Sequence, residues 1–177
     1  MNEIAKSNLR IEPIVELMRS YSHYNYWANT SVINWLRTKS PEELQKNVAS
    51  SFSGIELTLR HLWQAQEFWL DVIKDEEHKQ SGEPGPSNDT PGLSELVDLL
   101  IENSLMISNF VNQLDQDNLI KKVHIKSPWF ESNESRYEFI MQMVNHSTYH
   151  RGQITSIGRR LGFTDAPMTD YNFYLLR

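Results

Sequence analysis

The stretch NHSTYHRGQ, residues 145–153, decides how the rest of the chain is interpreted. It lies inside residues 135–161, a segment with the apolar periodicity and the end signals of one long helix. Its two histidines, His146 and His150, are four residues apart and therefore share one face of that helix. Two imidazoles placed in this way can hold one metal ion between them.

The face that carries these histidines is the one that should be buried. A stripe at alternating spacings of four and three residues marks the side of a helix that packs inside a bundle. Here the stripe consists of Phe139, Met143, His146, His150, Gln153 and Ile157. Burying an unpaired imidazole or amide costs about 1–3 kcal/mol, so the three polar members need partners. Either a metal ion or hydrogen bonds across a bundle would supply them.

The composition is that of an ordinary globular protein and excludes several function classes. The chain has 177 residues, of which 39% are hydrophobic and 23% charged, and this predicts a single domain over 1–177. A net charge of −6 argues against nucleic-acid binding. No apolar run approaches the ~20 residues that span a membrane, and the first residues lack a secretory signal, so we expect a cytoplasmic protein.

The absence of cysteine restricts the possible chemistry further. It excludes disulfides, zinc–thiolate sites, covalent haem attachment and a cysteine nucleophile. Any metal must therefore be held by nitrogen and oxygen ligands. Any thiol that takes part in a reaction must arrive with a substrate.

Four long segments have the 3–4 periodicity of amphipathic helices. They cover residues 13–38, 55–75, 91–114 and 135–161. Helices of this length in succession predict an all-α fold, a four-helix bundle. Gly162 is placed to end the last helix, and the aromatic tail at 163–177 is expected to pack on the bundle.

The connections between the long helices differ in character. A capping box at Ser40 predicts a short helical turn at 41–47, and a second one at Ser135 opens the fourth long helix. Residues 76–92, rich in glycine and proline, predict a long surface loop between the second and third helices. Residues 119–130 alternate briefly and predict a short strand or irregular excursion between the third and fourth.

A third histidine, His61, lies on the apolar face of the second long helix. With His146 and His150 it makes a possible set of three imidazole ligands, which leaves coordination positions open for water or substrate. Imidazole suits Zn, Ni, Fe and Cu, so the set does not choose the metal. Such a metal would lower the pKa of bound water to about 7 or stabilise an incoming thiolate.

The remaining candidates are weaker. The Glu-x-x-His motif of di-iron bundles and the His-Glu-x-x-His motif of zinc proteases are both absent. His78 falls in a polar loop and His124 on the irregular segment, so neither is expected to be a ligand. His23 lies off the core stripe and is kept as a reserve for substrate contact. For Arg151, which faces another side of its helix, we expect an ion pair with a neighbouring helix.

Several of these elements together resemble the DinB superfamily. Residues 146–153 resemble its C-terminal signature His-x-x-x-His-Arg-Gly-Gln, and this element is fairly specific. The other resembling elements are Tyr26-Trp27-Ala28-Asn29, Leu59-Arg60-His61-Leu62 with Trp69, and Arg160-Leu161-Gly162. The resemblance extends over essentially the whole chain.

The resemblance implies a four-helix bundle that binds one divalent metal through three histidines, here His61, His146 and His150. It also implies a homodimer. Members of known activity are mostly metal-dependent thiol transferases or isomerases that use a low-molecular-weight thiol, and others are described as metal-dependent hydrolases. Where relatives often carry an acid, five residues after the second-helix histidine, this chain has Gln66, followed by Glu67.

Three functions follow as expectations. The first is an enzyme that uses one divalent metal ion (Zn, Ni or Fe) to transfer a low-molecular-weight thiol to an electrophilic small molecule. The second is a metal-dependent hydrolase that uses metal-bound hydroxide. Its candidate general acid or base is Asp165 or Asp170 in the C-terminal tail. The third is a non-catalytic dimeric bundle with structural core histidines. No catalytic side chain is assigned.

Overall fold

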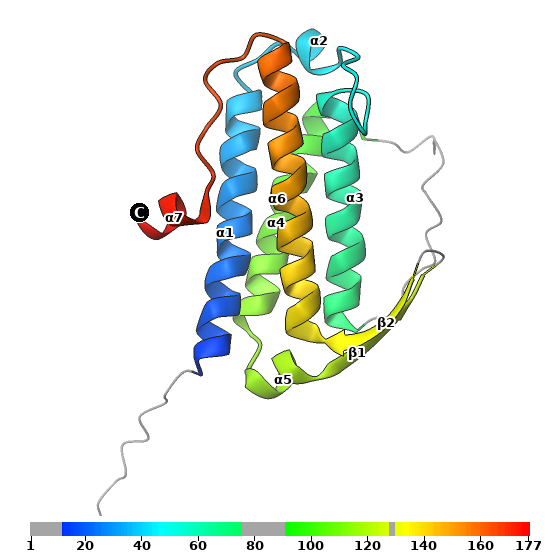
Figure 1. Cartoon of the computed structure of the whole chain (residues 1–177), viewed down its shortest axis with the longest axis vertical. Coiled ribbons are helices and arrows are strands. Elements are labelled where there is room, and N and C mark those ends of the chain that lie inside the picture. The colour runs from blue at the N-terminus through cyan, green and yellow to red at the C-terminus, as the bar shows by residue number, and fades with distance from the viewer. Residues whose placement is uncertain (1–11, 76–90, 128–129) are drawn as a thin grey trace, which may run out of the picture.

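The computed structural model describes residues 12–75, 91–127 and 130–177, and it shows a four-helix bundle with a small hairpin at one end (Figure 1). The all-α fold predicted from the sequence is confirmed. The long helices are α1 (Pro13–Leu36), α3 (Ile55–Lys74), α4 (Leu93–Asn112) and α6 (Arg136–Arg160). Their bounds agree with the predicted segments to within two residues at every end. Most of the predicted loop at 76–92 lies outside the described residues.

Short elements complete the fold. They are α2 (Pro41–Leu44), α5 (Gln116–Ile120), β1 (Lys122–Lys126), β2 (Glu131–Ser135) and α7 (Tyr171–Leu175). The two strands pair antiparallel, with Val123 opposite Glu134. The predicted excursion is therefore a hairpin, in which the buried side chains of Val123 and Ile125 face the bundle. The second strand was not predicted, because its sequence ESNES has no apolar alternation.

The helix ends follow the predicted signals, with one exception. At Ser40 the capping box forms, since its hydroxyl accepts from the Glu43 amide. At Ser135 the predicted capping box is wrong, because no side-chain cap is present and the hairpin sets where α6 begins. There the Arg136 amide donates to the Lys121 carbonyl at 3.0 Å.

The C-terminal end of α6 is closed as predicted by Gly162, whose φ is +93°. The amide of Gly162 donates to the Arg159 carbonyl, and that of Phe163 donates to the Gly158 carbonyl. This pair of bonds is a Schellman motif, which satisfies carbonyls that the helix leaves without partners.

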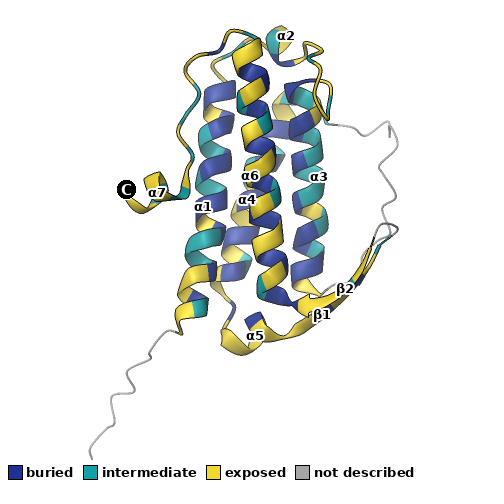
Figure 2. Cartoon of the chain, in the orientation of Figure 1, coloured by how far each residue is buried: buried dark blue, intermediate teal, exposed yellow. Residues whose placement is uncertain are grey.

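Inside the bundle, two apolar clusters are stacked along the helix axes. Figure 2 shows buried positions along all four long helices. One fills the end near the hairpin, with Met18, Val111 and Phe139 among its members. The other fills the opposite end, around Leu36 and Leu100. Between them lies a set of buried polar side chains, which we call the polar layer: Asn25, Asn29, Gln66, Ser104 and Arg151.

The polar layer is centred on Arg151, which is only 2% exposed. Its guanidinium donates to the side-chain oxygens of Asn25 and Asn29, both at 2.8 Å. It also donates to the hydroxyls of Tyr24 and Thr148. No carboxylate is among these partners, so the predicted ion pair is wrong: neutral oxygens on α1 and α6 solvate the charge. Burial lowers the pKa of Arg151.

The C-terminal tail packs against α1, as predicted. The Tyr24 hydroxyl donates to the Thr169 carbonyl at 2.9 Å, and the Tyr171 ring meets the Tyr24 ring edge-on at 5.1 Å. In contrast, Leu176 at the end of the tail remains 74% exposed. Among the described helices, none combines the length and apolar character needed to cross a lipid bilayer.

Candidate metal centre

The three predicted histidines meet where α3 and α6 run side by side (Figure 1). The Nε2 atom of His146 lies 3.3 Å from Nε2 of His61 and 3.1 Å from Nε2 of His150. One ligand atom from each residue lies within 4.8 Å of the others. His150 is buried, whereas His61 and His146 are half-buried. The three residues, called the His triad below, thus lie at the edge of the core, where a small molecule can reach them.

The distances from His146 Nε2 to the other two Nε2 atoms suit neighbouring ligands of one divalent metal. Metal–imidazole bonds of about 2.0–2.1 Å place two neighbouring ligand nitrogens about 3.3 Å apart in a tetrahedral site and about 2.9 Å apart in an octahedral one. Hydrogen bonds alone satisfy the His triad less well. If the proton on His146 Nε2 is donated to one neighbour, it is not available to the other. A cation at the centre satisfies all three lone pairs at once.

The orientation of His150 is fixed by the side chain that follows it one turn later. The Oε1 atom of Gln153 lies 2.7 Å from Nδ1 of His150 and can only accept, so Nδ1 carries the proton. The Nε2 atom of His150 is then left with its lone pair directed at the other two histidines. A ligand histidine normally has such an outer partner, which sets its tautomer.

Gln153 also connects the His triad to the segment before α3. Its amide nitrogen donates to the Ser51 hydroxyl at 3.2 Å. The next residue, Phe52, stacks on the ring of His61 with centroids 4.2 Å apart. This aromatic cover was missed by the sequence analysis, because Phe52 stands between serines in a stretch that reads as a polar turn. Its signal was a lone aromatic residue just before the helix that carries His61.

The turn that places Phe52 depends on Gly54. Its φ of +125° is unfavourable for residues with a side chain, and an added Cβ would lie 2.6 Å from the Lys46 carbonyl oxygen. A glycine is therefore required where the chain turns into α3.

Burial keeps the His triad neutral in the absence of a metal. It lowers the pKa of His61 to about 4, with repulsion from His150 as the second cause. It also lowers the pKa of His146 to about 4, and there both neighbours contribute. The pKa of His150 is lowered by burial and raised in part by its bond to Gln153. Near pH 7 the imidazoles therefore offer lone pairs rather than charges.

The other histidines lie apart from this cluster. His124 is exposed on the hairpin, 2.9 Å from a Glu131 oxygen, as expected for a residue that is not a ligand. His23 is exposed on α1 and contacts the hydroxyl of Tyr174 in the tail at 3.1 Å. His78 lies outside the described residues.

The acids and the amide singled out from the sequence also lie elsewhere. Asp165 accepts from Lys39 and Trp35, and these bonds lower its pKa. Asp170 is at the N-cap of α7. Gln66 belongs to the polar layer, where its oxygen lies 3.0 Å from the Ser104 hydroxyl.

Comparison with known proteins agrees with this fold. A model of the DinB family matches residues 12–176. The chain is 29% identical to Protein DinB of Bacillus subtilis (strain 168) over 157 residues, which are 86% of this chain and 90% of that protein. A crystal structure of a DinB-like protein from Bacillus subtilis, YjoA, is similar in fold, with a TM-score of 0.58 at 14% identity over 90% of this chain and 99% of that one. The chain therefore belongs to the DinB family.

Proposed function

We propose that His61, His146 and His150 bind one divalent metal ion and that the protein uses it to transfer a low-molecular-weight thiol to an electrophilic small molecule. The observation that carries the proposal is that Nε2 of His146 lies 3.3 Å from Nε2 of His61 and 3.1 Å from Nε2 of His150, with one ligand atom of each residue within 4.8 Å of the others. Three protein ligands leave coordination positions for a substrate, as in catalytic sites. The metal, Zn, Ni or Fe, would stabilise the thiolate of a bound thiol at neutral pH.

Thiol transfer is favoured over hydrolysis by what surrounds the His triad. Among the described residues, the hydrogen bonds and ring contacts that the three imidazoles make outside the His triad go to Phe52, Tyr149 and Gln153. None is a carboxylate, and hydrolysis would need a general base or acid near the reacting atoms. A thiol transfer needs only that the thiol lose its proton and that the electrophile approach it. The His triad is half-buried and is flanked by the aromatic rings of Phe52 and Tyr149. These surroundings suit the deprotonation of a thiol at the metal and the approach of an electrophile.

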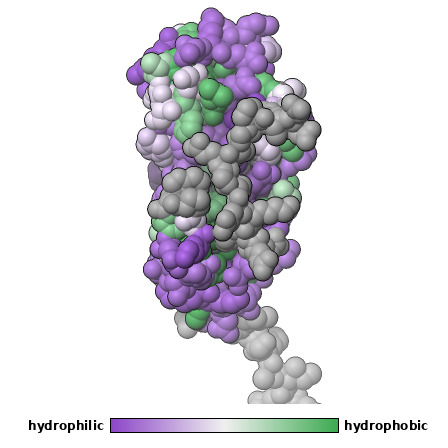
Figure 3. Space-filling view, turned by 90° about the vertical axis from the view of Figure 1, so that its right-hand side faces the viewer, coloured by the Kyte–Doolittle hydropathy of each residue, from purple (hydrophilic) through white to green (hydrophobic). Residues whose placement is uncertain are grey.

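The proposal also covers the ligand, the location and the oligomeric state of the protein. We expect a small-molecule substrate, a location in the cytoplasm and association of two copies of the chain. On the side of the molecule that faces the viewer in Figure 3, the described apolar side chains reach the surface in small separate groups.

The first experiment is elemental analysis of protein purified without a histidine tag. We expect about one divalent metal per chain in the wild type and none in His61→Ala, His146→Ala or His150→Ala. The matched control is His124→Ala, which removes an exposed imidazole far from the His triad and should keep its metal. A wild type without metal after reconstitution with Zn²⁺, Ni²⁺ or Fe²⁺ would overturn the proposal and favour structural histidines.

The second step tests the reaction with 1-chloro-2,4-dinitrobenzene and a low-molecular-weight thiol. The thiol gives its proton to solvent, a carbon–sulfur bond forms and chloride leaves. Catalysed formation of the thioether should disappear with chelator, return with metal and be absent in the His146→Ala variant. Activity that survives complete removal of the metal would contradict the proposed role of the ion.

A further inference from the structure

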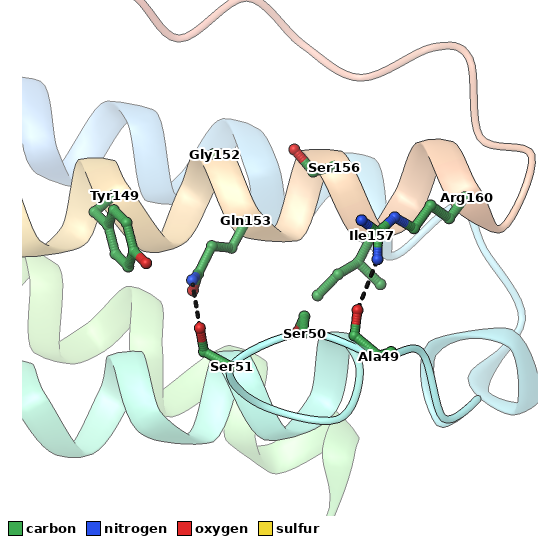
Figure 4. Close-up of a pocket in the computed structure, with 9 residues that line it drawn as sticks. All are labelled: Ala49, Ser50, Ser51, Tyr149, Gly152, Gln153, Ser156, Ile157 and Arg160. Atoms are coloured by element: carbon green, nitrogen blue, oxygen red, sulfur yellow. Dashed lines mark hydrogen bonds between the residues drawn. The ribbon is translucent and has the colours of Figure 1, made fainter.

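Hollows border α6 towards both of its ends. The one towards the C-terminal end has a volume of about 480 Å³ and lies against the segment 49–51 (Figure 4). Two hydrogen bonds cross it, one from the Gln153 amide to the Ser51 hydroxyl and one from the Arg160 guanidinium to the Ala49 carbonyl. Both side chains are therefore already used to hold α6 and this segment together.

The hollow towards the N-terminal end of α6 has a volume of about 340 Å³ and a different lining. Half of the lining residues are aromatic, and they come from α3, the hairpin and the first two turns of α6: Trp69, Phe130, Ser132, Glu138, Phe139 and Gln142. Figure 1 shows the hairpin beside the neighbouring ends of α3 and α6. Because Ser132 is paired with the buried Ile125, it shares the face of the hairpin that is directed at the bundle. This hollow therefore lies between the hairpin and the bundle.

The three aromatic rings of this lining are nearly parallel. The centroid of the Trp69 ring lies 5.9 Å from that of Phe139 and 6.3 Å from that of Phe130, and the interplanar angles are 25° and 22°. Trp69 and Phe139 are buried, whereas Phe130 remains 41% exposed. An exposed ring at one end of a stack offers a flat surface on which a further planar molecule can stack.

The lining also carries a negative charge, that of Glu138, which makes no ion pair with a described residue. The carboxylate accepts from the Tyr137 hydroxyl, and this bond raises the pKa of Tyr137. The lysines of β1 that could neutralise it are instead paired with acids of β2, as Lys122 with Glu134 and Lys126 with Glu131. Glu138 therefore leaves a negative charge without a counter-ion beside the aromatic rings.

The rings and the charge favour the same kind of ligand. Aromatic ring faces attract cations, and a carboxylate without a counter-ion attracts them further. A cavity of about 150 Å³ holds one benzene ring. A hollow of about 340 Å³ therefore has room for two or three fused rings.

From this arrangement we infer that the hollow binds a planar organic cation of two or three fused rings, stacked against the aromatic lining and neutralised by Glu138. The inference goes beyond the proposed function and does not rest on it, because no lining residue belongs to the His triad. The site requires no metal, so it can be tested on protein from which metal has been removed with chelator.

Three probes separate the contribution of the charge from that of the rings. They are N-methylquinolinium, a bicyclic cation; quinoline, which has the same two rings and is uncharged at neutral pH; and tetramethylammonium, a cation without rings. Calorimetric titration of chelator-treated protein at neutral pH gives the affinity for each. We expect N-methylquinolinium to bind about tenfold more tightly than either of the other two.

Two variants and their matched controls locate the binding. Glu138→Gln should reduce the preference for N-methylquinolinium over quinoline to about threefold or less, because only the attraction of the rings remains. Its control is Glu102→Gln, which removes an exposed acid of α4 and should keep the preference. Phe130→Leu should weaken both ring compounds about fivefold, whereas Phe173→Leu, which removes an exposed ring of the tail, should change neither. Thermal unfolding of all variants checks that the fold is kept.

Several outcomes would overturn the inference. One is a wild type that does not bind N-methylquinolinium, or that binds it no more tightly than quinoline. Another is a preference that Glu138→Gln leaves unchanged, or affinities that Phe130→Leu leaves unchanged. Equal binding of tetramethylammonium and N-methylquinolinium, or loss of the preference in Glu102→Gln as well, would show attraction to general surface charge instead of a site for a planar cation.

Discussion

Replacing Gln153 by leucine removes the acceptor that fixes the proton on His150 while keeping a side chain of similar volume. The bond that is lost is short, 2.7 Å, and His150 is only 4% exposed, so water cannot easily replace it. Loss of such an outer partner typically lowers metal affinity about 10- to 100-fold. That corresponds to about 1.4–2.8 kcal/mol, and the burial of His150 favours the upper half of this range.

Replacing Gln153 by glutamate should act in the opposite direction. A carboxylate accepts the same Nδ1 proton in a charge-assisted hydrogen bond, which is about twice as strong as a neutral one. It also makes the opposite ring nitrogen a better ligand. We therefore expect metal affinity to increase by about 1 kcal/mol, or about fivefold. Affinity should then decrease from the glutamate variant to the wild-type glutamine and to the leucine variant.

The assay is competition for Zn²⁺ against a chromophoric chelator at about pH 8, where the imidazoles are neutral because their pKa values are lowered. The matched control is Gln142→Leu, an exposed amide on the same helix, which should leave affinity unchanged. The reasoning is refuted if Gln153→Leu binds zinc as tightly as the wild type. It is equally refuted if Gln153→Glu binds more weakly while its melting temperature is unchanged.

Two further predictions concern stability. Because the pKa values of His61 and His146 are lowered to about 4, the unfolded metal-free chain takes up more protons than the folded one below about pH 6.5. The free energy of unfolding should therefore be largest above that pH and should fall towards pH 4, less steeply in His146→Ala; denaturant titrations across this range would show it, and a flat profile would contradict the burial of the imidazoles. On α6, an added Cβ at Gly158 would lie 2.6 Å from the buried Trp35 ring, whereas one at Gly152 would meet nothing. We expect Gly158→Ala to lose about 1–2 kcal/mol and Gly152→Ala to gain up to about 1 kcal/mol, measured as unfolding free energies; equal effects would contradict the packing.

Much of the candidate site could be predicted because it lies on long helices. Helical periodicity places His146 and His150 on one face without any knowledge of the tertiary structure, and it places His61 on the packed face of α3. What periodicity cannot distinguish is the centre of the core from its edge. The stripe on α6 and the packed face of α3 were expected to be buried throughout, yet His146 and Gln153 on α6 and His61 on α3 are only half-buried in the structure.

The rest of the site depends on contacts between distant segments. Phe52 covers His61 because Gly54 turns the chain, and its stacking distance has no counterpart in sequence spacing. The partners of Arg151 could not be named for the same reason: Asn25 and Asn29 lie on another helix, more than 120 residues away. The strand β2 was missed because its pairing with β1, and not its own composition, makes it a strand.

The polar layer has a consequence for how the helices are aligned lengthwise. Apolar clusters tolerate sliding, since one aliphatic contact can replace another at little cost. Arg151 does not, because a shift of α6 by one turn, about 5.4 Å, would carry its charge away from the Asn25 and Asn29 oxygens into an apolar cluster. The polar layer therefore specifies the lengthwise register of α6 against α1, because other registers would bury the Arg151 charge without its hydrogen-bond partners. By holding α6 in one register, it also fixes the height at which His146 and His150 meet His61.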